Sequence, residues 1–142
     1  DVQNLTKEIE YITSNKNGDI FKILAKFGKT SLESSDTLDL ERVNGAITSI
    51  ERSDIFITSD YAKYNYTTQN SKFYDNVIIK YENKIITCDN FDLNISEDIA
   101  VAYSNVIVKD DVSIMRAQKI TIDIITKDIF INSNKKVKII KN

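Results

Sequence analysis

The sequence contains no histidine, no proline and no tryptophan, and it has one cysteine and three glycines among its 142 residues. Histidine is the usual general base near neutral pH and the commonest metal ligand, so its absence removes the residue on which most acid–base and metal sites depend. One cysteine excludes a disulfide within the chain. No glycine-rich phosphate-binding loop is present either. These absences predict a protein without catalytic residues, a metal site or a cofactor.

The charge of the chain is nearly balanced. Nineteen Lys and Arg residues oppose 21 Asp and Glu residues, which gives a net charge of −2 with both signs dispersed. Nucleic-acid-binding domains present a basic patch, so we do not expect nucleic acid as a partner. No stretch approaches the roughly 20 apolar residues that cross a bilayer, and no signal peptide is evident. The sequence starts at Asp1, and we expect a membrane anchor or signal to precede it.

The chain repeats itself with a period of 29 residues. Residues 57–80 of the first copy are identical to residues 86–109 of the second at nine aligned positions, and a third copy from Met115 keeps the apolar positions. A fainter earlier copy aligns residues 23–29 with residues 57–63. A period of this length predicts stacked units, each of which needs its neighbours to bury its apolar face.

Within each copy, apolar and polar residues alternate, which is the period of a β-strand with one buried face. The alternation slips once per copy, directly after Ser59, Cys88 and Ala117. A slip at the same place each time predicts a bulge or bend where the strand turns a corner. A free cysteine packs as a small apolar residue, so we interpret Cys88 as part of the core and not as a nucleophile. The pattern predicts one all-β, elongated domain over residues 1–142, with no substantial helix.

Two Asn-Gly pairs predict hairpin turns, because both residue types tolerate positive φ. The first pair is Asn17-Gly18 and the second is Asn44-Gly45. Residues 1–15 precede the first turn and alternate through Ile9 and Tyr11, which predicts an edge strand.

Two carboxylates, Asp60 and Asp89, lie one repeat apart. Two acids on adjacent strands can act as acid and base or can bind a cation. The third copy carries Gln118 at this position, so we interpret the pair as solvated residues at the corner. Asn76 and Asn105 also recur at the repeat spacing, and we interpret them as turn residues or a side-chain ladder.

The inward columns of isoleucine, phenylalanine and tyrosine must be shielded from water by another apolar surface. Either two sheets pack on each other as a filled core, or they part and leave an apolar groove for a lipid. The residue pattern alone is compatible with both.

Several short motifs, in this order and spacing, resemble the LptC family of lipopolysaccharide transport. They are the run KILAKFGK at residues 22–29, the corner ITSDYAK at residues 57–63, TCDN at residues 87–90, and Met115-Arg116 followed by a small residue. The resemblance covers about residues 8–140 and is to the periplasmic domain of the family. The family favours glycine where this chain has Ala117, which is a departure from the family pattern at the bend.

The resemblance implies a twisted, open β-jelly roll of stacked antiparallel strands whose two sheets diverge and shelter lipid acyl chains. It also implies a periplasmic domain with an inner-membrane anchor at its natural N-terminus. Such a domain is a non-enzymatic conduit that passes lipopolysaccharide from an inner-membrane ABC transporter with LptBFG-like subunits to a periplasmic bridge protein. On this interpretation the lipid-lining residues are Ile57, Tyr64, Phe73, Phe91, Leu93, Ile95, Ile120, Ile122 and Ile124.

An open sheet has two unpaired edges, which proteins either protect or use. The last strand contains Val137 and Ile139 among lysines, and the resemblance implies that this edge receives the first strand of an LptA-like partner. The opposite edge, near residues 8–12, would face the transporter. Two alternatives remain open: a soluble LptA-like bridge protein, and a structural or adhesive β-solenoid with a dry core and no ligand.

Overall fold

The computed structural model of the protein describes residues 6–132 and 138–141, and within them every regular element is a β-strand. The prediction of an all-β fold is therefore confirmed. No helix among these residues is long and apolar enough to cross a membrane. The ten strands are β1 (Thr6–Ser14), β2 (Ile20–Thr30), β3 (Thr37–Thr48), β4 (Ile55–Asn65), β5 (Ser71–Tyr81), β6 (Lys84–Asn94), β7 (Ile99–Lys109), β8 (Ser113–Asp123), β9 (Ile129–Asn132) and β10 (Lys138–Lys141).

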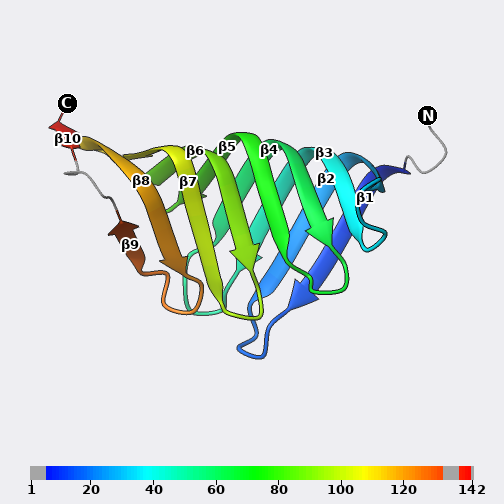
Figure 1. The fold of residues 1–142 in the computed structure, drawn as a ribbon. Coiled ribbons are helices and arrows are strands. Elements are labelled where there is room, and N and C mark those ends of the chain that lie inside the picture. Colours follow the sequence, from blue (N-terminus) through cyan, green and yellow to red (C-terminus); the bar gives the residue numbers. More distant parts are fainter. Residues whose placement is uncertain (1–5, 133–137, 142) are drawn as a thin grey trace.

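All ten strands form one antiparallel sheet in which β1 to β8 follow one another in sequence order (Figure 1). The outer side of β8 is shared, because β9 pairs with its second half and β10 with its first half. The 29-residue period is thus a two-stranded hairpin: β4 with β5, then β6 with β7. Each hairpin buries its inward face only when the next hairpin continues the sheet, as the repeat length predicts.

Each long strand bends near its middle, so the single sheet folds over into two facing halves (Figure 1). We call these halves the first arm and the second arm, and the row of residues between them the bend. The first arm contains residues 9–14, 20–25, 43–48, 55–59, 77–81, 84–88, 106–109, 113–117 and 138–141. The second arm contains residues 27–30, 37–41, 61–65, 71–74, 90–94, 99–103, 119–123 and 129–132.

The bend coincides with the predicted slips of the alternation. The pairing of β4 with β5 shifts register between Thr58 and Tyr61, and that of β6 with β7 shifts between Thr87 and Asn90. Two exposed residues in succession, such as Asp60 and Tyr61, then separate the buried columns on the two arms. The inward face can therefore stay apolar through the turn, which confirms the predicted function of the slip.

In the repeats that begin at Ile57 and Ile86, the bend is stabilised by an equivalent asparagine–aspartate pair. Asn76 donates a hydrogen bond from Nδ2 to Asp60 Oδ2 at 2.6 Å, and Asn105 donates likewise to Asp89 at 2.6 Å. Asn76 and Asn105 have positive φ values of 53° and 55°, which asparagine tolerates better than most residues. Because β5 lies between the strands of Asp60 and Asp89, the two carboxylates are not adjacent. Each is held by an amide, so the pairing of acids considered from the sequence does not occur.

Replacing Asn76 with Val should lower the free energy of unfolding by about 1–2 kcal/mol, because a β-branched residue is strained at positive φ. Asn76→Gly should be close to the wild type, since glycine adopts this conformation without strain. Lys80→Val, at an exposed position of the same strand, is the matched control. Urea denaturation of the three variants measures the difference, and an Asn76→Val protein as stable as the control would contradict the explanation.

The core lies between the arms and is built from the alternate residues of both. Its largest side chains with almost no exposed surface include Phe73, Phe91, Ile57 and Ile79. Cys88 is buried in the same core, as predicted, and burial raises the pKa of its thiol to about 12. A thiol with that pKa is protonated near neutral pH and is a poor nucleophile.

One predicted turn is confirmed and the other is wrong. The chain turns between β1 and β2, where Gly18 has a φ of 86°. Asn44 and Gly45 instead lie in the middle of β3, paired on both sides. Gly45 is needed there because Phe73 reaches across from the second arm: a Cβ on Gly45 would lie 3.1 Å from Phe73 Cζ. The glycine allows close packing and does not serve a turn.

Candidate functional site

The predicted lipid-lining residues all lie on the inner side of the folded sheet. Ile57 belongs to the first arm, and six others belong to the second: Tyr64, Phe73, Phe91, Leu93, Ile120 and Ile122. Ile95 and Ile124 follow directly after β6 and β8. Eight of the nine are buried, and Ile95 is partly buried against them. The structure therefore brings the predicted set together in one place.

The set omits most of the first arm, which contributes equally to this interior. The buried columns opposite the predicted residues are Phe21, Ile23, Ile47, Ile55, Ile79 and Ile86. The same alternation that indicated the second-arm residues also marks these positions in the sequence. What the sequence could not indicate is which positions face each other, because that depends on the bend.

The interior is closely packed. Phe73 and Phe91 pair across β5 and β6 with ring centroids 6.1 Å apart. Tyr11 of the first arm stacks on Tyr64 of the second at 4.7 Å. Burial raises the pKa of both tyrosines above the usual value. The interior is thus a filled apolar layer between the arms.

A small cavity remains near the open end of this interior. Its volume is about 10 Å³, and its lining includes Tyr11, Tyr64, Leu93 and Ser71. The cavity is at the lower limit of what holds one water molecule. Ser71 is 6% exposed, and its Oγ has no hydrogen-bond partner among the described residues. An unpaired hydroxyl in an apolar interior is unfavourable, so the core is imperfectly packed at this place.

The arms are joined along the bend by continuous strands and are separate at the opposite end, which we call the mouth. Hairpin loops border the mouth on both sides (Figure 1). The first-arm loops are residues 15–19, 49–54, 82–83 and 110–112. The second-arm loops are residues 31–36, 66–70, 95–98 and 124–128.

Five polar residues connect loops across the mouth, and we call them the mouth network: Asn15, Asp19, Ser49, Asp98 and Lys127. Asn15 Nδ2 donates to Asp98 Oδ1 and to Asp19 Oδ2, both at 3.0 Å. Ser49 Oγ donates to Asp19 Oδ1 at 2.8 Å and accepts a bond of 2.9 Å from Lys127 Nζ. The bonds Asn15–Asp98 and Ser49–Lys127 therefore join the first arm to the second.

Lys127 is the most unusual member of the mouth network. It is 4% exposed, and its Nζ also donates to the carbonyl of Ile124. Burial lowers the pKa of Lys127, and the charge of nearby Asp19 opposes that shift. A buried lysine is rare unless it is paired, and here hydrogen bonds and the Asp19 carboxylate compensate it. The members of this network come from four separate loops, so no local sequence pattern indicates it.

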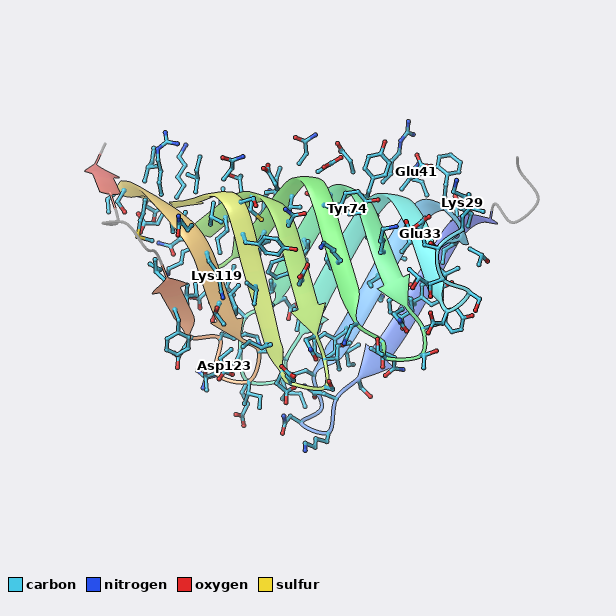
Figure 2. All side chains as sticks on the ribbon, in the orientation of Figure 1. Lys29, Glu33, Glu41, Tyr74, Lys119 and Asp123 are labelled. Atoms are coloured by element: carbon cyan, nitrogen blue, oxygen red, sulfur yellow. The ribbon has the colours of Figure 1, made fainter. Side chains whose placement is uncertain are left out.

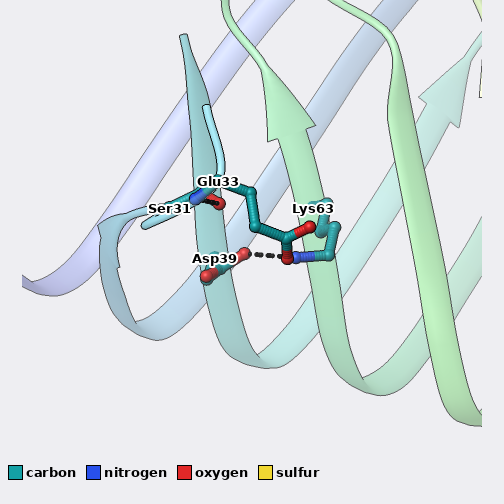
Figure 3. A network of polar contacts seen from close by, with 4 residues as sticks. All are labelled: Ser31, Glu33, Asp39 and Lys63. Carbon is teal, nitrogen blue, oxygen red and sulfur yellow. Dashed lines mark hydrogen bonds and ion pairs between the residues drawn. The ribbon is translucent and has the colours of Figure 1, made fainter. Parts of the chain in front are cut away.

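The outer faces of the arms differ in chemistry from the interior. Charged residues such as Lys29, Glu41 and Lys119 lie on the outer surface (Figure 2). On the second arm Lys63 Nζ lies 2.8 Å from Asp39 Oδ1 (Figure 3), and that hydrogen bond raises the pKa of Lys63. An exposed pair of this kind contributes about 0–1 kcal/mol. The outer faces are polar and the interior is apolar, so the interior is the candidate site for an apolar ligand.

The sheet ends at β1 on one side and at β9 and β10 on the other, as the open-sheet prediction requires. Of the two predicted docking residues, Ile139 lies in β10 and pairs with Met115. Val137 lies outside the described residues.

One antiparallel sheet, bent into two arms around an apolar interior, defines an LptA-like fold. The chain has a TM-score of 0.60 with the crystal structure of LptH from Pseudomonas aeruginosa, the LptA-homologous periplasmic component of the lipopolysaccharide transport device. That likeness covers 84% of this chain and 93% of LptH at 7% sequence identity, and it is a likeness of fold. The family model described as "Lipopolysaccharide-assembly, LptC-related" matches residues 3–141. The chain belongs to this LptC-related family, and it is a lipopolysaccharide-transport protein. No curated protein sequence matches it.

Proposed function

We propose that the interior between the two arms is the lipid-binding site, and that lipopolysaccharide acyl chains lie along its apolar columns. The observation that carries this proposal is the arrangement of the arms: their facing columns are apolar and buried, and a mouth opposite the bend lies between them. The sugar and phosphate groups of the lipid would stay in water outside the mouth.

A bound acyl chain can compensate for the apolar contacts that are lost when the arms separate. The interior holds a cavity of only about 10 Å³, so an acyl chain must take the place of contacts between the arms. Burial of each methylene is worth about 0.8 kcal/mol, so a long chain replaces the lost contacts with contacts of the same kind. We propose a non-enzymatic role, in which the domain supplies apolar surface and an associated ABC transporter supplies the energy.

Photo-crosslinking tests which face binds the lipid. A photoreactive residue at Phe91 or Ile122, which are 0% and 3% exposed, should capture lipopolysaccharide. The matched controls are photoreactive residues at Asp92, which follows Phe91 in β6, and at Thr121, which precedes Ile122 in β8. Both positions lie on the opposite, outward face of their strands. They should capture little lipid, and equal capture on both faces would contradict the proposal.

A second candidate function is a structural or adhesive domain with a dry core. The observation that favours it is the close packing of the interior, where Tyr11 and Tyr64 stack between the arms and the cavity beside them measures about 10 Å³. A fluorescent fatty acid distinguishes the two functions: it should bind the purified protein if the interior is a lipid site and should find no site if the core is permanently filled.

We further propose that this is the periplasmic domain of an inner-membrane-anchored protein, working with LptBFG-like transporter subunits. The C-terminal edge would bind an LptA-like partner by β-strand addition, which continues the sheet and joins two interiors into one path. The proposal is supported by the position of β10, which pairs with β8 on one side only among the described strands.

Ile139→Pro tests this edge, because proline in an edge strand removes an N–H group and restricts the backbone. We expect it to abolish capture of an LptA-like partner in a pull-down with little change in melting temperature. Ile12→Pro, on the opposite edge strand β1, is the control and should leave capture unchanged. If the Ile139→Pro protein still retains the partner at the wild-type level, docking does not use this edge.

A further inference from the structure

The mouth network is the place where the two arms are held together by polar contacts. Along the bend the arms are continuous strands with their ladders of backbone hydrogen bonds. Among the described residues, two side-chain hydrogen bonds cross the mouth between the arms, Asn15–Asp98 at 3.0 Å and Lys127–Ser49 at 2.9 Å. They join residues 83 and 78 positions apart in the sequence. Separation of the arms at the mouth breaks both of these bonds.

The chemistry of these bonds makes them reversible. When a polar pair separates, water takes over the lost hydrogen bonds, so both the closed and the open state have satisfied donors and acceptors. Lys127 gains hydration on opening, since burial disfavours its charged form in the closed state. Asp98 likewise exchanges the Asn15 amide for water. The mouth network therefore holds the arms closed without making the open state prohibitive.

The interior beside the mouth is also imperfectly packed. The stacked rings of Tyr11 and Tyr64 come from opposite arms, 4.7 Å apart. The cavity next to them exposes Ser71 Oγ, which has no partner in the described part of the chain. Separation of the arms here would give this hydroxyl access to water or to a polar group of a ligand.

We infer that the mouth network is a latch: its two cross-arm bonds keep the interior closed in the lipid-free protein and open to admit a lipid chain. This inference rests on the proposed lipid site between the arms. It adds to that proposal the route of entry, the segments that move, and the residues that control the movement.

A covalent lock across the mouth tests the latch. Cysteines at positions 15 and 98, Asn15→Cys with Asp98→Cys, are joined by a short bismaleimide in a Cys88→Ser background. The matched control joins Ser53→Cys to Glu82→Cys in the same background. Ser53 and Glu82 are hydrogen-bonded at 3.2 Å but belong to neighbouring loops of the first arm, so their linkage leaves the mouth free. Circular dichroism establishes that both linked proteins remain folded.

The readout is the uptake of a fluorescent fatty acid and of purified lipopolysaccharide. Linkage of positions 15 and 98 should reduce uptake at least tenfold relative to the unlinked protein, while the linked control retains it. Equal uptake by the mouth-linked protein and its control would overturn the latch and leave the lipid site standing. If the unmodified protein takes up neither probe, the lipid site itself fails, and the latch fails with it.

A second variant tests the latch in the opposite direction. Asp98 and Lys127 have φ values of 53° and 65°, so the double substitution Asp98→Gly with Lys127→Gly removes both cross-arm bonds and keeps a tolerated backbone. It should take up the fatty acid severalfold faster than the wild type, measured by stopped flow below its melting temperature. An uptake rate equal to or slower than that of the wild type would count against the latch.

Discussion

Phe91→Ala is expected to lower the free energy of unfolding by about 3–5 kcal/mol, which is the cost of truncating a fully buried phenylalanine. Phe91 is 0% exposed and packs against Phe73 in the centre of the second arm. The loss combines the transfer of the missing ring with the cavity that remains. Chemical denaturation in urea measures it.

The control for this prediction is Phe130→Ala. Phe130 lies in β9, at the C-terminal edge of the second arm, and is 53% exposed. Truncation of an exposed residue should change stability by no more than about 0.5 kcal/mol. Similar effects of the two substitutions would show that the interior is not packed as described, because Phe91 would then lack its close neighbours.

Gly45→Leu should also be strongly destabilising. A Cβ alone at this position would lie 3.1 Å and 3.3 Å from two atoms of the Phe73 ring, and the rest of a leucine side chain has no room between the arms. Overpacking of a filled core costs typically about 1–3 kcal/mol and sometimes more. Thermal and urea unfolding should both register the loss.

Ala46→Leu is the matched control for Gly45→Leu. Ala46 is the next residue of β3, pairs with Phe56, and faces outward. The same leucine there should be tolerated, because it meets solvent and a partly exposed ring. If Gly45→Leu is as stable as this control, Phe73 does not cross the interior as the structure has it.

The sequence predicted the strands and the bend well, because both leave local signals. Alternation marks the buried column, and the shift after Ser59 and Cys88 marks the bulge in each repeat. The repeat made these signals visible, since a deviation that recurs after 29 residues is not accidental. The predicted lining residues followed from the same columns, and the structure places them together.

What the sequence could not predict depends on contacts between the arms. Asn44-Gly45 has the composition of a hairpin turn, and only the approach of Phe73 from the other arm explains the glycine. Asp60 and Asp89 align in the repeat, but the intervening strand β5 separates them. The mouth network joins residues about half the chain apart, such as Asn15 and Asp98. Its members carry no shared pattern, so only the bend and twist of the sheet bring them together.

The serial order of the strands has a consequence for how this chain folds. From β1 to β8 each strand pairs with the next one along the chain, across connections of two to six residues. Short closures are entropically inexpensive, and low contact order is associated with rapid folding. Unlike a sandwich whose strands pair over long distances, this sheet can start at any hairpin and extend in both directions. The two-residue connection between β5 and β6 is the shortest of these closures, so we expect this central hairpin to form early.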